Sequence, residues 1–134
     1  MLRVLVDADN VSPRRLQPVL DAVSGSGSPV RLTASGTTQA LARLSWPDGA
    51  QLLPTTGWQR ADVALAQAYV PSEDPLILVS GDGDFGLLTS RHPGPVLVVS
   101  GAPSARLRNG TTVVDPASDG VAPILAWLRA NPAG

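Results

Sequence analysis

The feature that most constrains the fold is an alternation of short, mainly apolar runs with amphipathic segments along the whole chain. Runs suited to single buried strands cover residues 2–6, 29–34, 50–53, 75–79, 95–99 and 111–114. Patterns with helical spacing lie at residues 12–23, 37–44, 60–69, 85–90 and 121–128. Alternating strands and helices predict an α/β fold, a three-layer αβα sandwich with a mainly parallel sheet of five or six strands.

Length and local signals indicate a single domain. The chain has 134 residues, which fits one hydrophobic core. Ser12 and Pro13 supply an N-cap and a first helical residue, and the Gly/Ser segment 24–28 ends that helix in a loop inside the domain. We expect the domain to cover residues 1–130 and residues 131–134 to form a short tail.

Composition excludes several classes of chemistry. The chain has no Cys, and all 10 basic residues are Arg, so disulfides, thiol nucleophiles, a P-loop lysine and Schiff-base catalysis are excluded. The net charge of −1 lacks the positive field of many nucleic-acid-binding proteins, so such a contact would need a local Arg patch. Apolar runs are too short to span a membrane, and the first residues do not read as a signal peptide. We expect a cytoplasmic protein with no membrane association.

Acidic and polar residues gather where the expected strands end. Open parallel sheets bind ligands beyond the carboxyl ends of their strands. The residues that directly follow the first and fourth strands, or begin the helix after the third, are Asp7, Asp9, Asn10, Asp62, Ser80, Asp82 and Asp84. Clustered carboxylates repel one another unless a cation holds them, and a set of oxygen ligands predicts Mg²⁺ or Mn²⁺. Each Asp could instead cap a helix or favour its first turn.

Three segments carry the pattern of a known family. Residues 4–10 read Val-Leu-Val-Asp-Ala-Asp-Asn, an apolar strand followed by Asp and Asn, and residues 60–66 read Arg-Ala-Asp-Val-Ala-Leu-Ala. Residues 76–85 read Leu-Ile-Leu-Val-Ser-Gly-Asp-Gly-Asp-Phe. In this order they resemble the motifs of the NYN domain (LabA-like), within the PIN-like nuclease superfamily. The resemblance implies a Rossmann-like PIN fold and metal-dependent hydrolysis of RNA.

The resemblance also implies a role for each matching position. The catalytic and metal-site residues would be Asp7, Asn10, Asp62, Asp82 and Asp84, with all four Asp residues binding one or two Mg²⁺ or Mn²⁺ ions. Ser80 would shape the turn and hydrogen-bond a metal-bound water, and Arg60 would contact the substrate phosphate. The chain departs from the family pattern at Ala68, where many members have another Asp, and in lacking a Lys before the central Asp.

The implied partner is RNA, single-stranded or structured. Candidate backbone contacts are Arg14, Arg15, Arg60, Arg106 and Arg108, each of which could equally be a solvated surface charge. Trp46 and Trp58 could stack a base or pack against the core, and Trp127 should dock on the sheet. A homodimer or a protein partner would also fit, because PIN-like proteins often pair.

Two other functions stay open from the sequence. An NYN domain could bind RNA or protein without cutting, which Ala68 and the low net charge favour. A haloacid-dehalogenase-like phosphatase would use Asp7 as a nucleophile within its Asp-x-Asp opening, but that family needs a cationic residue in a later motif and would leave Asp62 idle. Convergence of Asp7, Asp62 and Asp82 on one ion would distinguish the nuclease.

Overall fold

The computed structural model describes residues 1–56, 60–80, 83–101 and 111–132. Six strands form one sheet in the order β3-β2-β1-β4-β5-β6, and every neighbouring pair is parallel. The strands are β1 (Leu2–Asp7), β2 (Val30–Gly36), β3 (Gln51–Pro54), β4 (Leu76–Val79), β5 (Val96–Val99) and β6 (Thr112–Val114). The expected α/β fold is confirmed, with six strands and a wholly parallel sheet.

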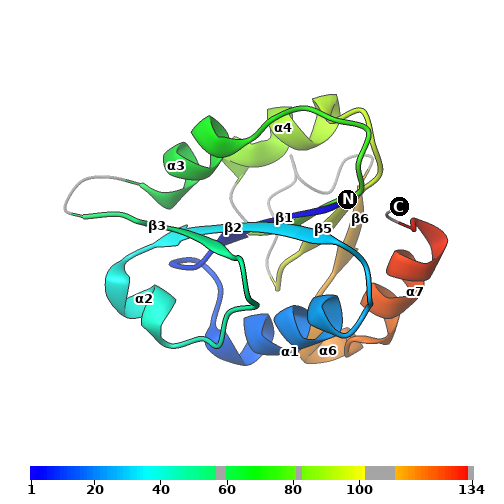
Figure 1. The fold of residues 1–134 in the computed structure, drawn as a ribbon, viewed down its shortest axis with the longest axis horizontal. Coiled ribbons are helices and arrows are strands. Elements are labelled where there is room, and N and C mark those ends of the chain that lie inside the picture. The colour runs from blue at the N-terminus through cyan, green and yellow to red at the C-terminus, as the bar shows by residue number, and fades with distance from the viewer. Residues whose placement is uncertain (57–59, 81–82, 102–110, 133–134) are drawn as a thin grey trace.

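Helices cover both faces of this sheet and complete the three layers (Figure 1). On one face lie α1 (Pro13–Ser24), α2 (Thr38–Ala42), α6 (Pro116–Asp119) and α7 (Ala122–Ala130). On the other lie α3 (Ala61–Ala68) and α4 (Gly86–Arg91), with the 3₁₀ turn η1 (Gly83–Phe85) leading into α4.

The strand order places a change of direction at the centre of the sheet. From β1 the chain adds β2 and then β3 on one side, and then returns to place β4 on the other side of β1. The segment after β1 leads to α1 on one face, and the segment after β4 leads to α4 on the opposite face. In sheets of this kind, the crevice between two such diverging connections is where ligands bind.

Alternating side chains of the central strands supply a core on each face. Val4 and Val6 belong to the larger cluster, which includes the buried side of α1 and Ile124 of α7. Leu5 belongs to the second cluster, with Leu65 of α3 and with residues of β4, β5 and η1. This alternation follows from the two-residue period of a strand. It anchors α3 and η1, the two elements that carry Asp62 and Asp84.

One helix departs from the sequence analysis. Ser12 caps α1 as expected, by accepting a hydrogen bond from the Arg15 backbone N–H. Helix α6 was not predicted, because only four residues form it and its sequence reads as a turn. Asp115 caps α6 by accepting a hydrogen bond from the Ala117 N–H. Over the described residues, no helix has the length and apolar character needed to cross a bilayer.

Helix α3 offers a matched test of this packing, because Leu65 is fully buried whereas Val63 is 51% exposed. We expect Leu65→Ala to lower the free energy of unfolding by about 2–5 kcal/mol, since it opens a cavity beneath α3. Val63→Ala should change it by less than about 0.5 kcal/mol. Urea unfolding followed by circular dichroism measures both. Equal effects of the two substitutions would contradict the assigned packing of α3.

Candidate functional site

A buried carboxylate lies at the crevice between β1 and β4. Val6 and Val79 are partners in the parallel register, so the next residues along each strand, Asp7 and Ser80, come side by side. Both residues are fully buried. The Ser80 hydroxyl donates a hydrogen bond of 3.0 Å to Oδ2 of Asp7. The topology of the sheet therefore brings the first and third sequence motifs into direct contact.

A second donor comes from the turn that follows β1. The Asn10 side-chain amide donates to the same Oδ2 of Asp7 at 2.7 Å, and the Asn10 backbone N–H donates to the Asp7 carbonyl at 3.3 Å. A buried carboxylate is costly unless hydrogen bonds or a cation compensate the lost hydration. Asn10 and Ser80 supply such hydrogen bonds and also fix the orientation of the Asp7 carboxylate.

A second cluster lies where α3 meets η1. Asp62 occupies the first turn of α3, where the helix dipole favours a negative charge. The Arg60 guanidinium bridges two carboxylates, because its Nη2 donates to Asp62 Oδ2 at 2.8 Å and to Asp84 Oδ2 at 3.0 Å. Asp62 is nearly buried, with its side chain 10% exposed, whereas the side chains of Arg60 and Asp84 are more than half exposed. The cluster thus joins an inner and an outer carboxylate through one cation.

The structure brings most of the predicted site residues into these two clusters. Asp7, Asn10 and Ser80 form one cluster, and Arg60, Asp62 and Asp84 form the other, with α3 packed against both β1 and η1. Asp82, the remaining predicted ligand, lies outside the described residues. Within the described part of the chain, no three acidic or histidine side chains form a group that could hold a metal by themselves.

Asp9 has a different role from Asp7. Its Oδ1 accepts a hydrogen bond of 2.9 Å from the backbone N–H of Thr37, the residue that caps α2. Asp9 therefore ties the loop after β1 to the start of α2.

An open hollow of about 460 Å³ adjoins Asn10. It lies between the loop after β1 and helix α2, and its polar lining includes Thr37, Gln39 and Arg43. Sequence analysis did not single out Gln39 or Arg43, because the short α2 segment carries no recognisable motif. The parallel sheet nevertheless makes the segment after β2 a neighbour of the segment after β1.

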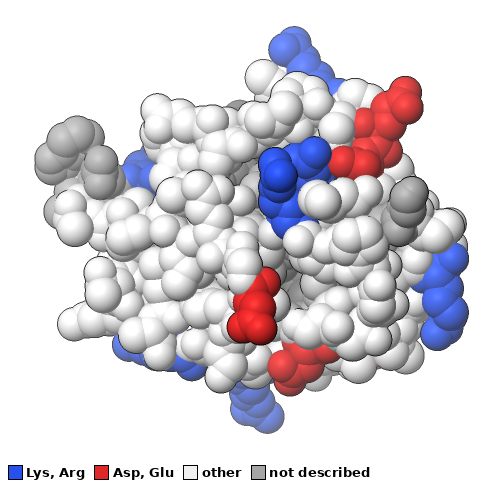
Figure 2. Space-filling view, in the orientation of Figure 1, with Lys and Arg blue, Asp and Glu red and all other residues white. Residues whose placement is uncertain are grey.

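The other predicted substrate contacts are dispersed. Arg14 is exposed in the first turn of α1, whereas Arg15 donates from Nε to Asp115 Oδ1 at 3.0 Å, at the β6 side of the sheet. A Cβ at Gly101 would lie 2.7 Å from the Arg15 guanidinium, so Arg15 packs closely over the end of β5. Arg106 and Arg108 lie outside the described residues. On the face shown in Figure 2, the described basic side chains form separate groups rather than one continuous patch.

Two of the three tryptophans are described, and both have packing roles. Trp46 donates from Nε1 to the Leu41 carbonyl at 2.8 Å and packs against the core on the α1 face. Trp127 packs against the same core, as expected. Trp58 lies outside the described residues. For Trp46, the structure favours packing over base stacking.

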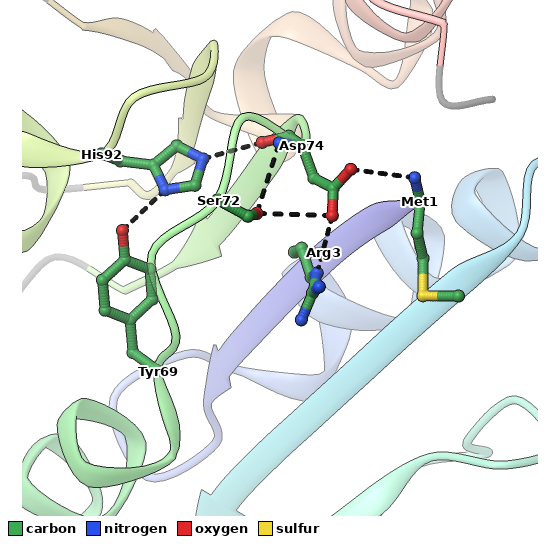
Figure 3. A network of polar contacts seen from close by, with 6 residues as sticks. All are labelled: Met1, Arg3, Tyr69, Ser72, Asp74 and His92. Atoms are coloured by element: carbon green, nitrogen blue, oxygen red, sulfur yellow. Dashed lines mark hydrogen bonds and ion pairs between the residues drawn. The ribbon is translucent and has the colours of Figure 1, made fainter.

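The single histidine belongs to a polar network at the opposite end of the strands (Figure 3). His92 is buried, and its Nε2 lies 2.7 Å from the Asp74 carbonyl oxygen, which can only accept. In the neutral ring, Nδ1 therefore accepts the hydrogen bond from the Tyr69 hydroxyl, also 2.7 Å away. Burial raises the pKa of Tyr69, which keeps the hydroxyl protonated as a donor. His92 joins Tyr69 to the segment before β4.

Asp74 extends this network to the start of β1. Its carboxylate accepts hydrogen bonds from the Met1 amino group at 3.1 Å, from Arg3 Nε at 3.0 Å and from the Ser72 hydroxyl at 3.3 Å. The contacts with Met1 and Arg3 hold the pKa of Asp74 below its ordinary range. These groups fasten the amino ends of β1 and β4 together, away from the candidate site.

The comparisons with known proteins bear on the fold. The chain matches no protein-family model, and no curated protein matches it. Among solved structures, it is similar to a protein of unknown function from Vibrio parahaemolyticus, with a TM-score of 0.59 and 22% sequence identity. The similarity covers 85% of this chain and 92% of the other. This likeness supports the α/β sandwich, and the resemblance to NYN domains stays a prediction.

The contribution of the contact between Ser80 and Asp7 can be tested by measuring the free energy of unfolding of variants. Ser80→Ala removes a donor from a buried carboxylate, and we expect it to lower the free energy of unfolding by about 1–3 kcal/mol. Ser90 is exposed on α4 and donates only to the carbonyl one turn before it, so Ser90→Ala should have an effect below about 0.5 kcal/mol. Urea unfolding at pH 7 compares the variants. If Ser80→Ala is as mild as Ser90→Ala, Ser80 does not support Asp7.

The network at Asp74 predicts a pH dependence. A carboxyl group with a lowered folded-state pKa stabilises the fold above its unfolded pKa of about 4, and this contribution is lost as the pH falls through the folded value. The stability difference between wild type and Asp74→Asn should therefore be largest at neutral pH and should shrink in acid. Arg3→Gln should reduce the same pH dependence. Urea unfolding from neutral to acidic pH measures it, and a difference that stays constant with pH would contradict the assignment.

Proposed function

We propose that this chain is a metal-dependent ribonuclease that hydrolyses phosphodiester bonds of RNA at the crevice between β1 and β4. The observation that carries the proposal is the buried Asp7 carboxylate at this crevice, oriented by Asn10 and Ser80. Asp62 of α3 and Asp84 of η1 supply two further carboxylates on the adjoining elements. The motifs that resemble NYN domains predict a catalytic acid at these same positions.

The donor chemistry of these residues fits Mg²⁺ or Mn²⁺. Asp7, Asp62 and Asp84 offer carboxylate oxygens, and the neighbouring Asn10 and Ser80 add only amide and hydroxyl groups. Oxygen ligands of this type suit hard divalent cations. Asp82 joins the proposed ligands from the sequence resemblance alone. When bound, the metal would polarise the scissile phosphate and lower the pKa of a bound water.

The chain's own residues would then position the substrate. Asn10 and Ser80 hold the Asp7 carboxylate in one orientation, which fixes the side of the crevice from which it can act. The hollow beside Asn10 gives room for a neighbouring nucleotide, and Arg43 in its lining offers a cation to the RNA backbone. The exposed Arg14 and Arg60 would add contacts to the RNA outside this hollow.

A second candidate is an RNA- or protein-binding module without cleavage. The observation that favours it is the Arg60 bridge, because Arg60 supplies positive charge to Asp62 and Asp84 without a metal. The described acids also form no three-residue metal group by themselves. A protein of this class would bind its partner in the presence of EDTA, and substitution of Asp7 would leave that binding unchanged.

Cleavage of labelled RNA with Mn²⁺, Mg²⁺ or EDTA tests the proposed function. We expect Asp7→Asn to lower the metal-dependent rate at least about 100-fold, because loss of even an outer-shell partner of a metal ligand commonly costs 10–100-fold. Asn can still accept the hydrogen bonds of Ser80 and Asn10, so the variant should fold. Asp48→Asn, in an exposed turn, is the matched control and should cleave like wild type.

The substrates should include a single-stranded RNA and a hairpin. Circular dichroism confirms that each protein is folded before its rate is compared. If folded wild-type protein fails to cleave with either metal, or if Asp7→Asn cleaves as fast as wild type, the nuclease assignment is wrong. Metal-independent RNA binding in that case would support the binding module.

A further inference from the structure

We propose that Arg60 is a tethered cation that holds Asp62 and Asp84 in the resting protein and passes to the substrate phosphate when a divalent metal binds. This inference rests on the proposed function, and it assigns a regulatory coupling to the same site. The metal ion and Arg60 compete for the carboxylates of Asp62 and Asp84. These carboxylates and the RNA phosphate compete in turn for Arg60. A metal ion that releases Arg60 from the carboxylates therefore strengthens RNA binding.

The geometry of the bridge supports the competition. A single nitrogen, Nη2 of Arg60, donates to Oδ2 of both carboxylates, at 2.8 Å and 3.0 Å. These two oxygens therefore converge on one centre of positive charge. A divalent ion held by the same oxygens would require the guanidinium to leave. Since two unneutralised carboxylates on neighbouring elements repel each other, Arg60 also keeps the metal-free cluster together.

Side-chain exposure distinguishes Arg60 from the inner carboxylate that it binds. The Asp62 side chain is 10% exposed and is fixed in the first turn of α3, whereas the Arg60 side chain is 61% exposed. Arg60 lies at the N-cap position in an extended conformation, with φ −108° and ψ 140°, and its side chain makes no capping hydrogen bond. Departure of the guanidinium from the carboxylates would therefore break no hydrogen bond of the helix cap.

The released side chain would stay at the crevice. Arg60 directly precedes α3, which packs against β1 and η1, the elements that carry Asp7 and Asp84. Because Arg60 is anchored one residue before the helix, its guanidinium would remain near these elements and could bind a substrate phosphate there. Arg is suited to this transfer because its planar group binds carboxylates and phosphates with similar fork geometry.

The alternative role for Arg60 is purely structural. A structural bridge would keep its contacts when metal binds, so its removal would weaken metal binding by disordering Asp62 and Asp84. The tethered-cation role has the opposite sign, since removal of the competitor tightens metal binding. The sign of the change in metal affinity therefore distinguishes the two roles.

Titration of RNA-free protein with Mn²⁺ in a calorimeter measures this sign in Arg60→Gln. We expect the variant to bind Mn²⁺ about 5-fold more tightly or better, at the low end of typical couplings between sites. Its melting temperature without metal should fall, and Mn²⁺ should raise it by more than in wild type. Arg60→Lys keeps a competing charge and should stay near the wild-type affinity. Arg3→Gln, which breaks an Arg–Asp pair at the opposite end of the strands, is the control and should leave Mn²⁺ affinity unchanged.

Cleavage kinetics at saturating Mn²⁺ test whether the released Arg60 binds the substrate phosphate. We expect Arg60→Gln to raise the KM for RNA about 10-fold or more, the effect of losing one charged hydrogen bond. Equal or weaker Mn²⁺ binding by folded Arg60→Gln would overturn the competition, and an unchanged KM would overturn the transfer to phosphate. Both results leave the nuclease assignment intact if wild type cleaves. Failure of wild type to bind Mn²⁺ and to cleave would overturn the proposed function and this inference together.

Discussion

The candidate site depends on the burial of one charged group where the chain reverses its direction across the sheet. Asp7 ends the central strand, and the strand beside it, β4, ends at Ser80. The Asp7 side chain is fully buried at this position, where the connections to α1 and α4 diverge toward opposite faces of the sheet (Figure 1). The hydrogen bonds of Ser80 and Asn10 reduce the cost of that burial, and they also hold the turn after β1 against the end of β4.

The two carboxylate clusters differ in how tightly the protein holds them. Asp7 is fully buried and accepts hydrogen bonds from two side chains of fixed position. Asp84 is largely exposed and pairs with an Arg60 side chain that is itself exposed. An exposed ion pair contributes little to stability, so Arg60 can leave Asp84 at low energetic cost. Under the proposed function, Asp7 would be a rigid ligand, and Asp84 would exchange Arg60 for a metal ion.

Much of the fold could be predicted from the sequence, and the reasons are local. The apolar runs at β1, β4 and β5 are too short for helices and are bounded by turn residues, and Ser12 with Pro13 marks the start of α1. The meeting of Asp7 with Ser80 followed from parallel topology. The Arg60 bridge could not be foreseen, because it joins residues 24 positions apart and depends on the rotamer of a long side chain. Helix α6 and the contact of Asp9 with Thr37 were missed for a different reason. A four-residue helix and a single side-chain contact at a helix start leave little periodicity in the sequence.

The polar groups at the two ends of the strands have different consequences for the protein. At the amino end, Asp74 and His92 are bound by neighbouring residues of the chain, in a network that joins the starts of β1 and β4. At the carboxyl end, Asp7 is held by Asn10 and Ser80, while Asp62 and Asp84 are bridged by the largely exposed Arg60 side chain. Because the network at the amino ends also joins β1 to β4, the pairing of these strands does not depend on the contacts at their carboxyl ends alone. Acidic residues can therefore be concentrated at the crevice without loosening the centre of the sheet.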